Sequence, residues 1–116
     1  VALHGAGGSH NMFFDGYGDG LAVDLARARG WILLAPQVGF LGCPVIEIID
    51  AISAHLPVDQ DQVFVLGHSM GAGATIRAAN DAASRPSGTV ARAASINAAA
   101  RSGASRNRCV SVSRSR

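Results

Sequence analysis

The chain has 116 residues, 48% of them hydrophobic, which is enough for one domain with a hydrophobic core and too few for two. No run approaches the ~20 consecutive apolar residues of a transmembrane helix, so the sequence predicts a soluble domain with no membrane span. The net charge of +2 hides an abrupt change along the chain. Residues 1–84 carry all eight acidic residues and three arginines, whereas residues 85–116 carry seven arginines and no acidic residue.

The first residues and the cysteines bear on compartment and cofactors. The chain begins with Val1 rather than Met, and "VALHG" has the pattern of a strand already under way. We therefore expect the natural N-terminus to be missing, which leaves localisation open, with a soluble cytoplasmic protein as the default. Cys43 and Cys109 lie far apart without metal-like spacing, and we interpret them as two unrelated thiols.

The first half of the chain alternates short apolar runs with one amphipathic segment. Residues 1–3 are a predicted strand, followed by the glycine-rich loop "HGAGGS" and a loop whose aromatic residues are expected to plug the edge of the core. The next segment has apolar residues at helical spacing, and the sequence predicts a helix over 20–29 that ends at Gly30. "WILLAP", residues 31–36, is a continuous apolar run and predicts a strand covered on both faces.

The second half continues the alternation. Pro44 is favoured in the first turn of a helix, and the pattern predicts a helix over 44–56 that stops at Pro57. "VFVL" predicts a strand, residues 70–82 a helix with Ala72, Ile76 and Ala79 on its inner side, and residues 89–96 a weaker strand. Strands that alternate with helices indicate the α/β class, with a mainly parallel sheet flanked by helices and right-handed crossovers.

The segment "VFVLGHSMGAGA" carries a serine between two glycines where an apolar strand ends. A sharp strand-to-helix turn would force Ser69 into a strained backbone conformation that leaves no room for side chains at Gly67 and Gly71. Glycine and serine are common in this chain, so the same pattern also arises by chance in a loop. The predicted strand before it and helix after it are the context that favours a nucleophilic serine.

Taken together, the His-Gly-x-Gly-Gly loop after one strand and Gly-x-Ser-x-Gly after a later one resemble the α/β-hydrolase superfamily, most of all its dienelactone hydrolase and esterase/depolymerase-like branches. The resemblance covers about residues 1–97 and implies a partial α/β-hydrolase fold. It makes Ser69 the nucleophile on a nucleophile elbow formed with Gly67, His68 and Gly71. The implied activity is hydrolysis of a carboxylic ester or related acyl bond through an acyl-serine, with a small-molecule ester as partner and without metal or organic cofactor. A serine peptidase and an acyltransferase are the alternatives.

The resemblance also implies an oxyanion hole. One N–H donor is that of Met70, and the other comes from Ala6 or Gly7 in "HGAGG". His68 is expected to form a wall of the pocket rather than to act as the base.

The catalytic triad is where the sequence departs from the family. Its order is serine, acid, histidine, yet no histidine follows His68, and the one later acid, Asp81, falls at the far end of the predicted helix. His10 and His55 are interpreted as a solvated loop residue and a solvated helix residue, with His10 the one candidate for an unusual base. We therefore expect an incomplete copy of a hydrolase, nearly inert as printed and marginally stable.

The last residues change composition sharply. We divide the chain into a partial hydrolase domain, 1–97, and an Arg/Ser/Ala-rich tail, 98–116, that is expected to be disordered. The favoured hypothesis is out-of-frame reading of a GC-rich gene, which also explains the missing acid and histidine. The alternative is a catalytically dead pseudoenzyme whose basic tail binds nucleic acid or an anionic surface; nucleic acid is not the partner we expect.

Overall fold

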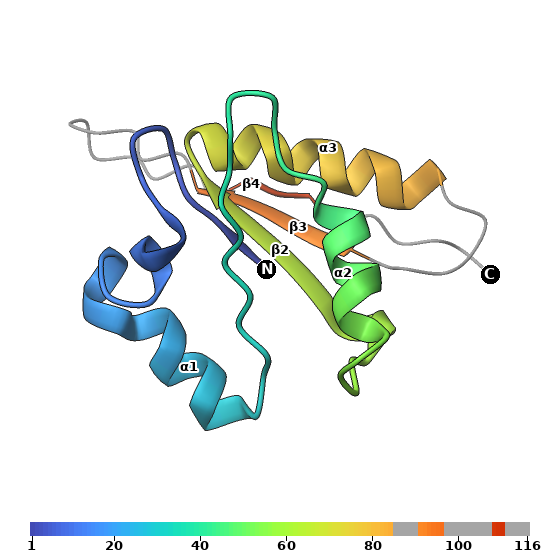
Figure 1. Ribbon diagram of the computed structural model, residues 1–116, viewed down its shortest axis with the longest axis horizontal. Helices are drawn as coiled ribbons and strands as arrows, with labels where there is room; N and C mark the ends of the chain where they lie inside the picture. Colours follow the sequence, from blue (N-terminus) through green and yellow to red (C-terminus); the bar gives the residue numbers. More distant parts are fainter. Residues whose placement is uncertain (85–90, 97–107, 111–116) are drawn as a thin grey trace.

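A computed structural model describes residues 1–84, 91–96 and 108–110, in which strands from distant parts of the sequence form one sheet (Figure 1). The strand order is β1–β2–β3–β4, with parallel pairing from β1 to β3 and antiparallel pairing of β4 to β3. The strands are β1 (Ala2–Leu3), β2 (Val63–His68), β3 (Ala91–Ile96) and β4 (Arg108–Val110). The chain thus has an α/β arrangement with a mainly parallel sheet, as the alternating pattern predicts at this level.

All three expected helices are present. They are α1 (Leu21–Arg29), α2 (Val45–Ser53) and α3 (Met70–Ser84), and three short 3₁₀ turns accompany them: η1 (His10–Phe13), η2 (Tyr17–Gly20) and η3 (Gln60–Gln62). Gly30 ends α1 as predicted, because it adopts φ 64° and its N–H bonds to the carbonyls of Ala26 and Arg27. Helix α2 stops at Ser53, short of the predicted residue 56.

The predicted strand at 31–36 is wrong. The segment has no strand conformation, and it is joined to β1 by a hydrogen bond from the N–H of Ala2 to the carbonyl of Leu34, 2.8 Å. Its apolar run is not covered on both faces: Trp31 is 56% and Ile32 49% exposed. The continuous apolar run predicted a strand buried on both faces, but the described residues leave part of this segment exposed.

By contrast, β3 is stronger than its sequence suggests. It pairs in parallel with β2 along all six residues, from Val63 opposite Ala91 to His68 opposite Ile96. Within the expected tail, Arg108–Val110 form β4, and the other residues of 98–116 lie outside the described part of the chain. The proposed role of that tail in binding an anionic surface therefore has no structural description.

The core lies between β1, β2 and the inner sides of α2 and α3. Its largest members are Leu3, Ile46, Ile49 and Val65. Helix α3 contributes small residues, so it can lie close to β2 and β3 (Figure 1). Ala72 and Ala79 are buried as predicted, but Ile76 is 51% exposed, and Ala74 and Ala78 take its expected place. Close approach of α3 to the sheet is what positions the turn before it.

Candidate active site

Ser69 forms the turn between the last residue of β2 and the first residue of α3. Its φ is +53°, and Asp19 is the one other non-glycine residue with positive φ in the described part of the chain. This left-handed conformation costs a serine about 1 kcal/mol or more, so it persists only where the surrounding structure enforces it. The residue is exposed, so its hydroxyl is open to solvent at this end of the sheet.

The glycines on either side of Ser69 enforce the turn. A Cβ at Gly67 would lie 2.5 Å from Thr75 Oγ1 and closer still to the carbonyl of Gly71. A Cβ at Gly71 would lie 2.7 Å from the carbonyl oxygen of His4 and closer to that of Leu3. Both contacts are far inside van der Waals distance, so neither position accepts a side chain. The expectation drawn from the Gly-x-Ser-x-Gly spacing, that larger residues would clash there, is met.

The "HGAGG" loop lies directly beside Ser69, although the two motifs are far apart in the sequence. A Cβ at Gly5 would lie 3.2 Å from Ser69 Cβ and 3.3 Å from the carbonyl oxygen of His68. The loop closes with a hydrogen bond from the N–H of Gly8 to the carbonyl of Gly5, 3.1 Å, and Gly7 has φ +75°. The fold therefore brings together the two glycine motifs that the sequence analysis identified.

The backbone groups expected to bind an oxyanion lie at this junction. Ala6 and Gly7 are exposed at the tip of the Gly5–Gly8 turn. Met70 is the first residue of α3, and the first N–H groups of a helix have no acceptor within the helix. Positive partial charge from the helix dipole adds to this N–H. These positions suit an anion beside Ser69, and their role remains a prediction.

His4 has a role that the sequence analysis did not identify. It is 1% exposed, and both of its ring nitrogens are bonded to backbone. The N–H of Val38 donates to Nε2 at 2.9 Å, which makes Nε2 the acceptor and leaves Nδ1–H to donate to the carbonyl of Gly5 at 2.8 Å. His4 thus links the glycine loop to the segment that leads to α2. The signal available in the sequence was a histidine placed directly after a short apolar strand.

The His68 ring contacts an aromatic neighbour, Tyr17. Tyr17 OH and His68 Nδ1 are 3.0 Å apart, and their rings meet edge to face at 5.2 Å. Phe13 packs against Tyr17 at 4.8 Å and is buried, as expected of an aromatic residue that plugs the edge of the core, but the same expectation is wrong for Phe14, which is 43% exposed. His68 is half-buried, and its expected role as a wall of the pocket stays a prediction.

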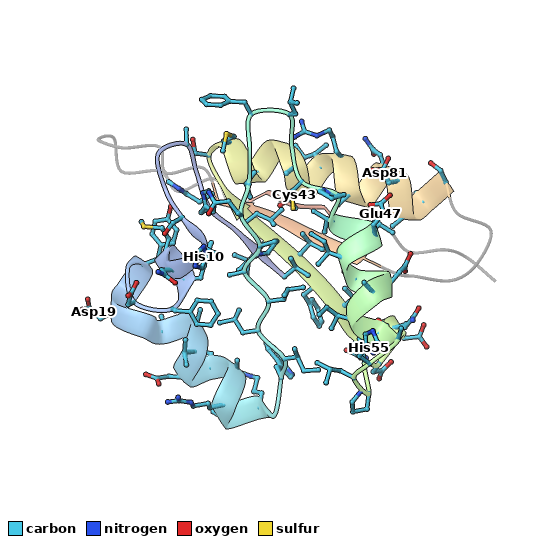
Figure 2. The ribbon with its side chains drawn as sticks, viewed as in Figure 1. His10, Asp19, Cys43, Glu47, His55 and Asp81 are labelled. Carbon is cyan, nitrogen blue, oxygen red and sulfur yellow. The ribbon has the colours of Figure 1, made fainter. Side chains whose placement is uncertain are left out.

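Among the residues that the structure describes, no base or acid is hydrogen-bonded to the Ser69 hydroxyl. None of the four histidines hydrogen-bonds to its hydroxyl. His10 is exposed on η1, where its backbone N–H bonds to Gln37 Oε1 at 3.2 Å, and His55 is exposed beyond α2. Asp81 lies toward the far end of α3 from the turn (Figure 2). Within the described part of the chain, the arrangement offers an exposed serine and candidate anion donors, with no proton acceptor hydrogen-bonded to the serine.

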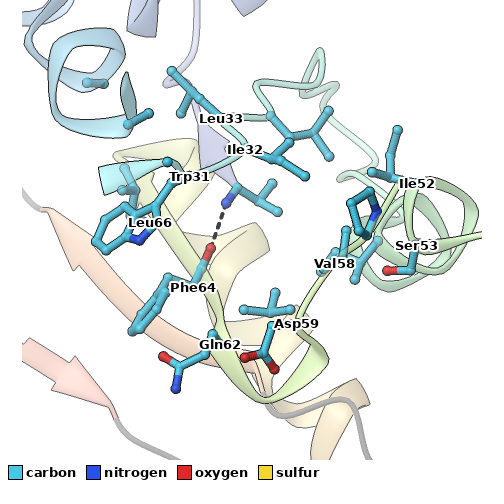
Figure 3. Close-up of a pocket in the computed structure, with 18 of the residues that line it drawn as sticks. Trp31, Ile32, Leu33, Ile52, Ser53, Val58, Asp59, Gln62, Phe64 and Leu66 are labelled. Atoms are coloured by element: carbon cyan, nitrogen blue, oxygen red, sulfur yellow. Dashed lines mark hydrogen bonds between the residues drawn. The ribbon is translucent and has the colours of Figure 1, made fainter. Parts of the chain in front are cut away.

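A separate apolar pocket of about 380 Å³ lies beside the start of β2 (Figure 3). Its walls come from α1, the 31–34 segment, α2 and β2, and Trp31 stacks on Phe64 with a ring separation of 5.8 Å. The Val1 amino group, which also lines it, bonds to the carbonyl of Phe64 at 2.6 Å, and burial lowers its pKa from 8.0 to about 6. We call this cavity the apolar pocket.

No cluster of three or more His, Cys, Asp or Glu residues within residues 1–84, 91–96 and 108–110 could hold a metal ion. Across the same residues, no helix combines the length and apolarity needed to span a bilayer. The chain matches no model of a known protein family, and no curated protein is significantly similar to it in sequence.

Proposed function

We propose that this chain carries the nucleophile and oxyanion-binding half of a serine hydrolase site of the α/β-hydrolase type, which acts on carboxylic esters through an acyl-serine. The observation that carries the proposal is the backbone of Ser69. An exposed serine with φ +53° stands between a parallel strand and a helix, with a glycine loop in contact with it. Strain at an exposed polar residue is typical of functional sites.

The chemistry follows from the positions of the backbone groups. Ser69 Oγ attacks the ester carbonyl carbon, and the carbonyl oxygen becomes an oxyanion. The N–H groups of Met70 and of Ala6 or Gly7 bind that oxyanion, and collapse of the tetrahedral intermediate expels the alcohol and leaves the acyl group on Ser69. The glycines of the loop matter because they let the carbonyl approach these N–H groups without a Cβ in its path.

Proton transfer is the step for which no side chain of the described residues is hydrogen-bonded to Ser69. The serine proton must leave as the new bond forms, and the histidines of the described part are bonded elsewhere or exposed away from the turn. Residual catalysis from the oxyanion hole alone falls several orders of magnitude below that of a complete triad. We therefore expect slow acylation and, for the same reason, slow deacylation of the chain as printed.

The test relies on this slow deacylation, which lets the acyl-serine accumulate. The chain is incubated with p-nitrophenyl acetate and imidazole, which stands in for the missing base, and acetylation is mapped by peptide mass spectrometry. We expect acetyl to accumulate at Ser69 in preference to Ser84, an exposed serine at the end of α3 whose hydroxyl bonds to the carbonyl of Asn80. The Ser69→Ala variant is the control. Equal acetylation of Ser69 and Ser84 in folded protein would contradict the proposal.

A further inference from the structure

The carbonyl of Gly5, at the start of the glycine loop, accepts two hydrogen bonds. His4 Nδ1 donates to it at 2.8 Å, and the N–H of Gly8 donates to it at 3.1 Å. The His4 ring is itself held in place, because its Nε2 accepts from the N–H of Val38 at 2.9 Å and the residue is 1% exposed. All three bonds have ordinary lengths. Together they fix the direction in which the Gly5 carbonyl points.

The direction of this carbonyl sets the direction of the next N–H group. The peptide bond between Gly5 and Ala6 is trans and planar, so the N–H of Ala6 points opposite to the carbonyl of Gly5. Since the carbonyl faces the buried ring of His4, the N–H of Ala6 faces away from that ring. Ala6 is exposed, and within the described part of the chain its N–H is bonded to no acceptor. It is therefore a free donor whose direction is imposed.

The Gly5–Ala6 peptide begins directly beside the candidate nucleophile, since a Cβ at Gly5 would lie 3.2 Å from Ser69 Cβ. The N–H of Gly7 is the other candidate donor of this loop, and it is held less firmly. The carbonyl of Ala6 would fix that N–H by the same rule, but it accepts no hydrogen bond among the described residues. The loop thus has one N–H that a buried side chain orients and one that no side chain orients.

We propose that His4 is a positioning residue of the oxyanion hole: by holding the carbonyl of Gly5, it aims the N–H of Ala6, rather than that of Gly7, at the oxyanion beside Ser69. The inference rests on the proposed function, because an oxyanion forms there only when Ser69 attacks an acyl carbon. A donor that is already oriented needs no reorganisation as negative charge develops. His4 acts only through the Gly5–Ala6 peptide, since both of its ring nitrogens are bonded to backbone.

Two substitutions separate the two bonds of His4. In His4→Asn the side-chain amide nitrogen lies close to the position of Nδ1 and can still donate to Gly5, whereas in His4→Gln the amide oxygen reaches toward Val38 and can accept its N–H. The readout is the rate of Ser69 acetylation by p-nitrophenyl acetate in the full chain with imidazole, over a series of ester concentrations. His4→Gln should lower the limiting rate by about tenfold or more, less than the ~10²–10³-fold loss when a donor is removed, with the half-saturating ester concentration little changed. His4→Asn should react at close to the rate of the parent.

A matched control separates positioning from stability. Each His4 variant loses one buried hydrogen bond, so both should unfold at lower urea concentration than the parent. Ile46→Val trims the buried core on α2, so it should also lower the urea midpoint but leave the acetylation rate unchanged. Circular dichroism checks that each variant is folded. A rate in His4→Gln equal to that of the parent, a loss in His4→Asn as large as in His4→Gln, or an equal loss in Ile46→Val would overturn the proposal.

A second measurement needs no substitution and holds even where a His4 variant fails to fold. With imidazole as base, Ser69 Oγ attacks the phosphorus of diethyl p-nitrophenyl phosphate and expels p-nitrophenolate, which leaves a phosphoryl oxygen in the place of the oxyanion. In amide NMR spectra the Ala6 proton should then move downfield, and the Gly7 proton much less. Reaction at Ser69 without a shift of Ala6, or with the larger shift at Gly7, would refute this inference alone. A folded parent in which Ser69 is neither acetylated nor phosphorylated would refute the proposed function and this inference with it.

Discussion

Replacing Gly71 by alanine should destabilise the domain far more than the same change two residues later. A Cβ at position 71 would meet the carbonyl oxygen of His4 at 2.7 Å and the Leu3 carbonyl more closely still. Both obstacles are backbone atoms at the end of β1, so no flexible side chain can move aside. Relief requires α3 to shift away from the sheet, which also opens the turn at Ser69.

The magnitude follows from the two environments. Overpacking a tight site typically costs 1–3 kcal/mol, and a clash with backbone on one side puts Gly71→Ala at about 3 kcal/mol. At Gly73 in the same helix the nearest atom to a new Cβ is Arg77 Nη1 at 3.7 Å, an ordinary contact. Gly73→Ala should therefore stabilise the domain by about 0.5–1 kcal/mol through helix propensity. The two variants differ by about 4 kcal/mol with opposite signs.

The assay is urea unfolding followed by far-ultraviolet circular dichroism. A urea m value of about 1 kcal/mol/M, at the low end for small proteins, separates the two midpoints by several molar. Gly71→Ala should be largely unfolded before urea is added if the parent is as marginal as its size suggests. Equal midpoints for the two variants would refute the claim that α3 is packed directly on the end of β1.

Three further outcomes follow from strain and from shifted pKa values. Ser69→Gly should raise stability by about 1 kcal/mol in urea unfolding, because glycine adopts φ +53° without strain, while it abolishes acetylation; an unchanged or lower midpoint would argue against a strained turn. Burial lowers the pKa of the Val1 amino group to about 6, so the unfolded chain binds its proton more readily and stability should fall by up to about 2 kcal/mol as pH drops from 8 to 6. One extra residue before Val1 should remove this dependence in the same unfolding assay. Burial, and then Glu47, raise the pKa of the Cys43 thiol, so in a Cys109→Ser background its alkylation by iodoacetamide at pH 8 should be slow and should accelerate in Glu47→Gln.

Local signals in the sequence predicted the parts of the fold that depend on local geometry. Gly30 ends α1 because glycine accepts a left-handed φ, and the Gly-x-Ser-x-Gly spacing predicted the crowding around Ser69. The strand expected at 31–36 failed because an apolar run shows a preference for burial, and not whether other segments cover it. β3 was only weakly indicated, since alanine-rich segments have little intrinsic strand preference and pairing with β2 decides their conformation.

The same distinction between local geometry and long-range packing applies to the candidate site. The backbone of the two glycine motifs could be predicted, because glycines at fixed spacing imply close approach. The tether from His4 to Val38 and the contact between Tyr17 and His68 could not, because each depends on how distant segments pack. No spacing in the sequence indicates which ring nitrogen will face which backbone group.

The proposed function requires that Ser69 reacts as a nucleophile when a base is supplied. It is tested by fluorophosphonate labelling of the folded chain, located by mass spectrometry, with and without imidazole and in a His10→Ala variant. We expect little labelling without imidazole, labelling at Ser69 when imidazole is added, and the same behaviour after His10→Ala. Strong labelling of Ser69 without imidazole that disappears in His10→Ala would show that a base is present, and imidazole-dependent labelling spread over other serines would show that Ser69 is not poised.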